Sequence, residues 1–276
     1  GVSAFAGCSA SLTVANDHPR YSSENGMLFN KEKTLLIQCP VSLTGTQVIP
    51  VSVVTIGVQA FFSCSGITAL EIPPTVSSIM DAAFVFCSGL TSIVLPETVT
   101  LLGDMVFQEC QGLTAAEIHT RSVSFQAFYG CTALITLVLG PNVKSIERSA
   151  FAKCQNLINL TIPTTVTSIG ETAFMECNAL SHVTIPASVA VLGRYAFYNC
   201  TGLQTADVYS RVVDNSAFSR CSQLNTVNLY SPWLSLDDYV FLNCGSLVSL
   251  KVHAVIPADL TPFENVFRGV SPLGCT

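Results

Sequence analysis

The sequence predicts an α/β-type solenoid, a right-handed stack of about ten turns with 21–23 residues in each turn. The first observation is the cysteine spacing, because the eight successive gaps between Cys64 and Cys244 are all 21 or 23 residues. The second is a phenylalanine three residues before ten of the twelve cysteines, preceded in eight cases by alanine. The third is a hydrophobic content of 49%, which a folded chain must bury in a regular core.

Composition excludes several classes of protein. Charged residues make up only 11% of the chain and the net charge is −6, so no basic surplus exists to meet the phosphates of a nucleic acid. A chain this apolar also buries enough surface to fold, which argues against disorder. The longest uncharged stretch, Thr34–Leu70, is broken by Pro40, Gly45 and Pro50 and by many Ser and Thr residues. We therefore expect no membrane-spanning helix.

The segment from Cys154 to Cys177 illustrates one turn. Leu157, Leu160 and Ile162 follow an L-x-x-L-x-I pattern whose end alternates as a strand with one buried face. Pro163 ends that strand because it cannot donate to a ladder. A second short extended segment, 166–169, is predicted to follow and to lead into about one helical turn around Phe174, where residues three apart share a face.

The same core columns recur in nine successive turns. The strand column reads Ile67-Leu70-Ile72, Leu90-Ile93-Leu95, Leu113-Ala116-Ile118, Leu134-Leu137-Leu139, Leu157-Leu160-Ile162, Leu180-Val183-Ile185, Leu203-Ala206-Val208, Leu224-Val227-Leu229 and Leu247-Leu250-Val252. A repeat of this kind is stable only against its neighbours, so the columns predict one continuous core. We expect a single domain over residues 1–276, with no internal boundary.

The two ends of the chain depart from the period. Residues 1–12 form a first partial repeat, 13–48 an insert, 49–253 the regular repeats and 254–276 an irregular end in which Phe267 takes the last phenylalanine position. Within the insert, a turn-rich segment over 21–26 is followed by two β-prone runs around Asn30–Lys33, which predicts an inserted β-hairpin. Because the chain begins abruptly inside a repeat-like motif and shows no signal peptide, we expect it to be a fragment of a longer precursor.

The repeated cysteines allow three interpretations. Zinc sites need clustered ligands such as C-x-x-C pairs, and the sequence contains none, so no metal or cofactor is expected. Disulfides between equivalent positions of neighbouring turns would have to join Cβ atoms about 4.8 Å apart, beyond the usual span of roughly 3.5–4.5 Å. The favoured interpretation is a column of buried free thiols packed behind the phenylalanines. Cys39 and Cys275 lie outside the repeat register and cannot be assigned from spacing.

A candidate binding patch lies one step beyond the strand, where most repeats carry proline. In the last three full repeats this position holds Tyr209, Tyr230 and His253, and the only tryptophan, Trp233, follows three residues after Tyr230. Exposed aromatic rings in a row suit macromolecular interfaces and sugar rings. The alternative is that these rings merely replace proline and cover the edge of the core. No catalytic motif appears, and identical repeats do not bring unlike groups together, so we expect no enzyme.

The repeat unit A-F-x-x-C-x-x-L-x-x-(L/V)-x-I-P-x-x-V-x-x-I-G resembles the leucine-rich repeats of BspA-like surface antigens, notably those of the Bacteroides type. The match runs in register from Ala60 to Val252, and the segment His18–Lys31 is similar to one common in bacterial members. The resemblance implies a leucine-rich repeat fold, export, display on the cell surface or secretion, and adhesion to host proteins or other cells. We expect a monomeric module that binds a protein partner. The alternatives are a carbohydrate-binding component of nutrient uptake and a passive spacer.

Overall fold

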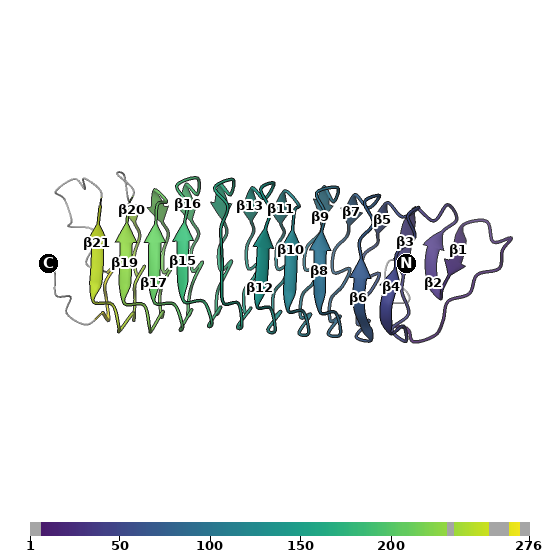
Figure 1. The fold of residues 1–276 in the computed structure, drawn as a ribbon, viewed down its shortest axis with the longest axis horizontal. Helices are drawn as coiled ribbons and strands as arrows, with labels where there is room; N and C mark the ends of the chain where they lie inside the picture. The colour runs from purple at the N-terminus through teal and green to yellow at the C-terminus, as the bar shows by residue number, and fades with distance from the viewer. Residues whose placement is uncertain (1–6, 231–234, 254–264, 271–276) are drawn as a thin grey trace.

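The computed structural model is a long rod whose turns follow one another along a single axis (Figure 1). It describes residues 7–230, 235–253 and 265–270. Over these residues the rod contains 21 strands and no helix. Nine short strands of two residues mark nine successive turns, so the solenoid has about nine turns where the sequence predicted about ten. Phe5, in the predicted first partial repeat, lies outside the described residues.

One face of the rod is formed by the longer strands, which run parallel in each ladder. They are β4 (Gly45–Val48), β6 (Ile67–Glu71), β8 (Ser92–Leu95), β10 (Ala115–Ile118), β12 (Thr136–Leu139), β15 (His182–Ile185), β17 (Thr205–Val208), β19 (Thr226–Leu229) and β21 (Ser249–Val252). Their pairing keeps equivalent residues opposite each other, as in Ala206 opposite Val227 and Asp207 opposite Asn228. We refer to this side as the strand face.

The strand column is interrupted where the sequence predicted it to continue. Leu157, Leu160 and Ile162 are buried as expected, but the segment forms only an isolated bridge between Thr136 and Asn159. This gap separates the ladder of β8, β10 and β12 from the ladder of β15, β17, β19 and β21, and β4 and β6 form a third ladder. Burial of the apolar side chains therefore maintains the register across a gap in the backbone ladder.

A second column of two-residue strands lies one step further around the turns. It comprises β5 (Thr55–Ile56), β7 (Ser78–Ile79), β9 (Leu101–Leu102), β11 (Ser122–Val123), β13 (Ser145–Ile146), β14 (Ser168–Ile169), β16 (Val191–Leu192), β18 (Val212–Val213) and β20 (Ser235–Leu236). These strands also pair in parallel, and in each of the first eight the second residue is buried. The predicted second strand column is therefore confirmed.

The N-terminal end of the rod is covered by an antiparallel ribbon. β1 (Tyr21–Glu24) pairs with β2 (Met27–Asn30), and β2 pairs with β3 (Leu35–Gln38), which is the hairpin expected around Asn30–Lys33. Most of the segment expected to be turn-rich is strand, and only Asn25 and Gly26 turn, with φ of 52° and 79°. β3 also pairs in parallel with β5, and β4 with β6, so parallel pairing along the rod begins at Leu35.

The predicted helical turns around the phenylalanines are wrong. In all nine turns the residues two before and two after the phenylalanine have positive φ, as at Ser149 (55°) and Lys153 (63°) around Phe151. A left-handed residue interrupts an α-helix, which needs negative φ throughout. The N–H of Phe151 instead donates to the carbonyl of Ala173 in the next turn of the rod, at 2.8 Å. These segments are tight turns whose hydrogen bonds alternate between their own turn and the neighbouring one.

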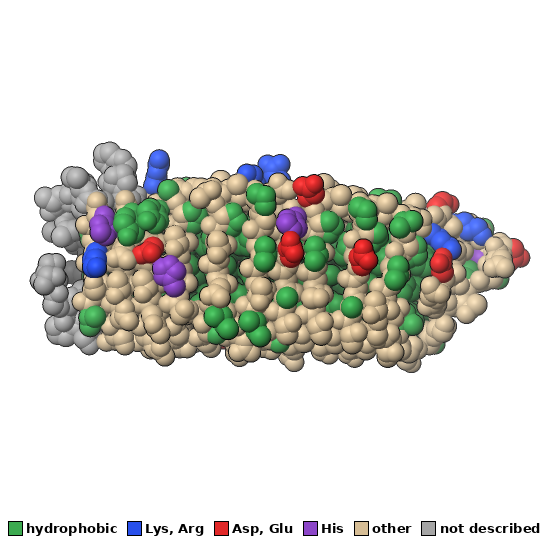
Figure 2. Space-filling view, viewed as in Figure 1, with side chains coloured by type: hydrophobic (Ala, Val, Ile, Leu, Met, Phe, Trp, Pro, Cys, Tyr) green, Lys and Arg blue, Asp and Glu red, His purple; other side chains and the backbone are tan. Residues whose placement is uncertain are grey.

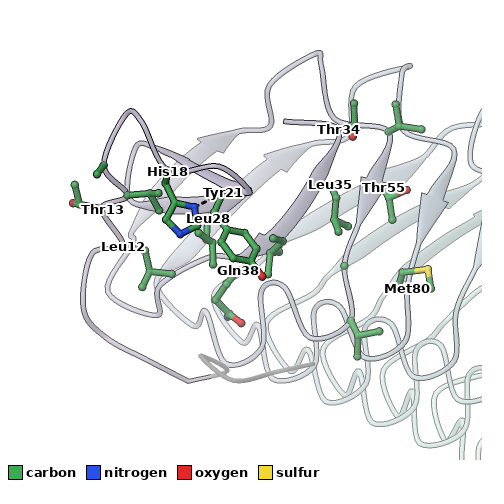
Figure 3. A pocket seen from close by; sticks show the side chains of 16 residues that line it. Leu12, Thr13, His18, Tyr21, Leu28, Thr34, Leu35, Gln38, Thr55 and Met80 are labelled. Carbon is green, nitrogen blue, oxygen red and sulfur yellow. Dashed lines mark hydrogen bonds between the residues drawn. The ribbon is translucent and has the colours of Figure 1, made fainter. Parts of the chain in front are cut away.

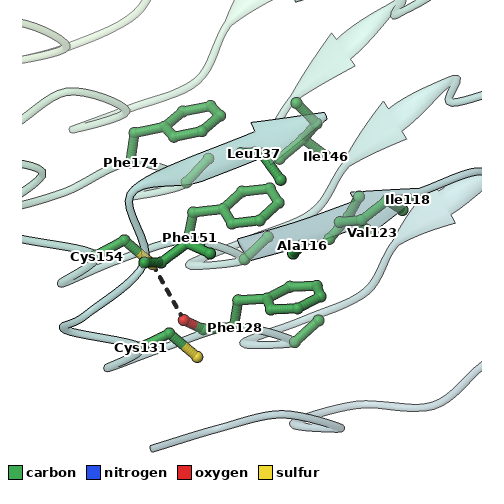
Figure 4. Packing of buried hydrophobic residues seen from close by; sticks show 14 of the residues in the cluster. Ala116, Ile118, Val123, Phe128, Cys131, Leu137, Ile146, Phe151, Cys154 and Phe174 are labelled. Carbon is green, nitrogen blue, oxygen red and sulfur yellow. Dashed lines mark hydrogen bonds between the residues drawn. The ribbon is translucent and has the colours of Figure 1, made fainter. Parts of the chain in front are cut away.

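The core is a continuous column of phenylalanine rings with the thiols beside it, as predicted (Figure 4). The rings from Phe61 to Phe241 are at most 1% exposed, and successive centroids lie 4.8 to 5.9 Å apart with nearly parallel planes. Phe267 continues the column by stacking on Phe241 at 5.7 Å. Aromatic pairs in this offset-stacked range add to the free energy of burial. The column therefore joins the turns into one core.

All eleven described cysteines are free thiols, which confirms the buried-thiol interpretation for the column. From Cys87 to Cys244 each thiol donates to the carbonyl oxygen of the phenylalanine in the preceding turn, at 3.0–3.3 Å. Burial raises the pKa of Cys110, Cys154 and Cys177. Their thiolates are thereby disfavoured, and with them nucleophilic reactivity.

Cys39 has a structural place that its spacing did not reveal. It is fully buried, and its carbonyl accepts the thiol of Cys64 at 3.6 Å, as the phenylalanine carbonyls do in later turns. Cys39 thus takes the phenylalanine position at the start of the column. Cys275 lies outside the described residues.

Candidate interaction surface

The predicted aromatic residues of the last turns stand in a row at the end of the strand face. Tyr209 stacks on Tyr230 with centroids 4.3 Å apart and planes 6° from parallel, and Tyr230 stacks on His253 at 4.5 Å and 5°. We call these three residues the aromatic stack. They follow β17, β19 and β21 directly, and these strands lie toward the C-terminal end of the rod (Figure 1). Hydrophobic and histidine side chains gather on the visible face near that end (Figure 2). Trp233 lies outside the described residues.

Parallel strands in register produce this arrangement. Equivalent positions of neighbouring strands lie about 4.8 Å apart, which is close to the contact distance of two flat rings. The backbone N–H groups of the aromatic residues also add one hydrogen bond to the parallel ladder of the longer strands. The N–H of Tyr209 donates to Ile185 at 2.9 Å, and that of Tyr230 donates to Val208 at 2.9 Å. Proline, which occupies this position in five other turns, has no N–H to donate.

A polar row lies beside the stack on the outward positions of the same strands. Asn228 donates its side-chain N–H to Asp207 at 2.6 Å, and the Nε2 atom of His182 lies 3.7 Å from an oxygen of Asp207. Lys251 stands opposite Asn228 in the ladder. Partial desolvation, then Tyr209 and Asp207, raise the pKa of the Tyr230 hydroxyl. A tyrosine hydroxyl is neutral at physiological pH even at its ordinary pKa near 10, so Tyr230 can donate a hydrogen bond there.

The stack offers ring edges and polar atoms more than ring faces. Tyr209 is 38% exposed, Tyr230 is half-buried and His253 is exposed. Because each ring covers its neighbour at 4.3 or 4.5 Å, no sugar ring fits between them. Tyrosine edges and hydroxyls beside a polar row are typical of protein–protein contacts. Among the described residues, no group of three or more His, Cys, Asp or Glu side chains could hold a metal ion.

The sequence analysis missed a second aromatic cluster, which lies on the tight turns. Tyr195 and Tyr198 meet edge to face at 5.3 Å, Arg194 lies 4.9 Å from the Tyr195 ring, and Arg220 lies 5.6 Å from the Tyr198 ring. We call these four residues the turn cluster. Comparison of the two positions flanking each A-F pair along the chain would have found it, but those positions were assigned to helical turns.

His119 occupies the same position after β10 as Tyr209 does after β17, but it has no aromatic neighbour. The adjacent turns carry Pro96 and Gly140 there, and the imidazole fills the space beside Gly140, where a Cβ would lie 2.4 Å from Nδ1. Its Nε2 atom lies 2.7 Å from Glu117 on the same strand. The aromatic stack is therefore confined to the last three turns.

Comparison with known proteins identifies the class. The model of the BspA type leucine rich repeat region, in six copies, matches residues 38–158 and 144–266. The match covers most of the chain, so the protein belongs to the BspA-type leucine-rich repeat family, as the repeat motif indicated. This repeat fold is generally used for protein interaction. No curated protein matches the chain. No helix in the described part of the chain is long and apolar enough to cross a membrane.

Three solved structures are similar to this chain. A leucine-rich repeat protein from Eubacterium ventriosum is 28% identical over 67% of this chain and 51% of its own, with a TM-score of 0.64. One from Bacteroides ovatus is 20% identical over 86% of this chain and 81% of its own, with a TM-score of 0.53. A leucine rich cell surface protein from Faecalibacterium prausnitzii is 19% identical over 94% of this chain and all of its own, with a TM-score of 0.43. The chain spans about half the length of the Eubacterium protein.

Proposed function

We propose that this protein is a non-catalytic, monomeric binding module that works outside the cell, as a surface-displayed or secreted adhesion protein, and holds a protein partner against its aromatic stack. The observation that carries the proposal is the row Tyr209–Tyr230–His253, with its polar neighbours Asp207 and Asn228. Stacked rings restrain one another, so they lose little conformational freedom when a partner docks. The rigid core beneath them serves the same end, because it fixes the spacing of the row.

The two alternatives differ in what the stack would do. A carbohydrate-binding component needs open ring faces on which a sugar can lie, and the ring-to-ring distances of 4.3 and 4.5 Å leave the inner faces covered. A passive spacer would not use the aromatic stack at all, and the rings would then only replace proline. The protein-binding proposal is favoured because it uses the ring edges, hydroxyls and polar row that are accessible.

The test is a binding screen with a matched pair of double variants. The purified protein is applied to immobilised extracellular-matrix proteins and to a glycan array. The Tyr209→Ala/Tyr230→Ala variant should lose binding to its protein target at least tenfold, since aromatic anchors carry about 2 kcal/mol or more each. The Tyr195→Ala/Tyr198→Ala variant, which alters the turn cluster instead, is the control and should keep it. Thermal unfolding establishes that both variants are folded.

Other outcomes separate the alternatives. Saccharide hits that depend on Tyr209 would favour the carbohydrate function, and equal loss in both double variants would contradict an assignment to the aromatic stack. Absence of any binding in either screen would favour the spacer. Display at the surface is tested separately, by the accessibility of the native protein to protease on intact cells, and the monomeric state by light scattering.

A further inference from the structure

An open cavity of about 1040 Å³ lies at the opposite end of the rod, between the N-terminal segment and the outward side of β3 and β5 (Figure 3). Apolar side chains from both sides line it, among them Leu12, Val14, Leu28, Leu35, Val54 and Met80. Its size is at the upper end of the range of small-molecule sites, about 300–1,000 Å³.

The hydrogen bonds of the N-terminal segment explain why the cavity is open. The N–H of Leu12 donates to the carbonyl of Gly26 at 3.2 Å, and the N–H of Val14 donates to the hydroxyl of Ser23 at 2.9 Å. Both bonds tie the segment to the β1–β2 ribbon rather than to β3 or β5. The segment therefore passes over the sheet instead of closing onto it, and Val54 remains 41% exposed within the cavity lining.

The residues that line the cavity favour an uncharged ligand. Among the described residues that line the cavity there is no Lys, Arg, Asp or Glu. A charged group buried without a partner costs far more than an apolar contact returns, so an ion has no counterpart here. The polar side chains are spread out: Thr34 and Thr55 lie toward one end of the cavity, and Thr13, His18 and Tyr21 lie toward the other (Figure 3). The side-chain N–H of Gln38, which also lines the cavity, donates to the carbonyls of Cys39 and Ala60.

His18 supplies a defined donor at its end. Its Nδ1 atom accepts the backbone N–H groups of Arg20 and Tyr21, at 3.3 and 3.1 Å. A neutral imidazole whose Nδ1 accepts carries its proton on Nε2. His18 is therefore held with Nε2–H free to donate to an oxygen of a ligand, beside the Tyr21 ring at 5.3 Å.

We propose that this cavity binds an uncharged amphiphile with one alkyl chain, such as a long-chain alcohol or ester, whose oxygen accepts from Nε2 of His18. The alkyl chain lies between the N-terminal segment and the outward side of β3 and β5, where Leu35 and Val54 contact it. This site lies at the other end of the rod from the aromatic stack, so the proposal does not depend on the proposed protein-binding function.

The test uses a neutral fluorescent probe, N-phenyl-1-naphthylamine, and its displacement by 1-dodecanol. The wild-type protein should bind one probe with a saturable rise in fluorescence, and 1-dodecanol should displace it at least about tenfold more effectively than dodecanoate, because the anion has no partner. Thr55→Trp places a large ring in the cavity and should weaken probe binding by about tenfold or more.

Ser168→Trp is the matched control, because Ser168 begins β14 as Thr55 begins β5, far along the same strand column. It should leave probe binding unchanged, and thermal unfolding establishes that both variants are folded. The proposal is overturned if the wild-type protein gives no saturable signal, if Thr55→Trp binds the probe as well as Ser168→Trp does, or if dodecanoate displaces the probe as well as 1-dodecanol.

Discussion

Replacement of Phe151 by alanine should destabilise the rod more than any change on the strand face. The ring is fully buried and stacks between Phe128 at 5.3 Å and Phe174 at 5.4 Å. Truncation of a core phenylalanine costs about 3–5 kcal/mol. The loss of two stacked contacts places this site at the upper end of that range. Small domains are stable by only about 5–15 kcal/mol, so one substitution removes a large share.

The assay is thermal and urea unfolding followed by circular dichroism, with Thr161→Ala as the exposed control. Phe151→Ala should lower the melting temperature on the order of 10 °C, and the control should shift stability by no more than about 0.5 kcal/mol. Because turns interact mainly with their neighbours, the variant should also broaden the transition as the two halves of the rod uncouple. Equal shifts for Phe151→Ala and Thr161→Ala would refute the assigned register.

Three further predictions test the turns and the thiol column. Burial raises the pKa of Cys154, so above about pH 9 the unfolded state loses a proton that the folded state keeps, and stability falls as pH rises. Cys154→Ala should therefore reduce the fall of the unfolding free energy between pH 8 and pH 10 by about 1.4 kcal/mol in total, and an unchanged fall in urea titrations over that range would contradict this. Ala82→Gly, at a φ of 55°, should raise stability by about 0.5–1 kcal/mol, whereas Ala179→Gly, away from the positive-φ positions, should lower it by a similar amount in the same melts. Gly89→Ala places a Cβ 2.1 Å from a backbone oxygen of the preceding turn and should cost about 1–3 kcal/mol. Thr161→Ala, at an exposed position of the strand column, is the control, so matched losses at the two sites would disprove the close approach.

The core columns were predictable because each turn repeats the same pattern of apolar residues. Phe151, Leu157 and Val166 are buried at the spacing that the periodicity indicated, and the thiols are free as the Cβ geometry implied. These positions depend on apolar residues at a fixed interval, and this pattern recurs in nine turns. The row Tyr209–Tyr230–His253 was predictable for the same reason, since equivalent positions of successive turns must lie side by side.

The errors concern hydrogen bonds and conformations that periodicity does not encode. A spacing of three residues around Phe151 fits one helical turn and also fits the tight turn observed, because both bury the same side chains. The choice between them depends on Ala173, 22 residues away, whose carbonyl accepts the Phe151 N–H. The place of Cys39 likewise depends on a distant residue, because its carbonyl accepts a hydrogen bond from the thiol of Cys64.

The linear chain therefore specified which side chains face inward, how long each turn is and where aromatic rings line up, because these follow from apolar residues recurring at a constant interval. The tertiary structure decided three further features: the positive-φ residues of the tight turns, the gap in the strand column at 157–162 and the cavity beneath the N-terminal segment. Each of these depends on which backbone groups of distant residues meet, and a backbone N–H is chemically the same at every position until a partner is beside it.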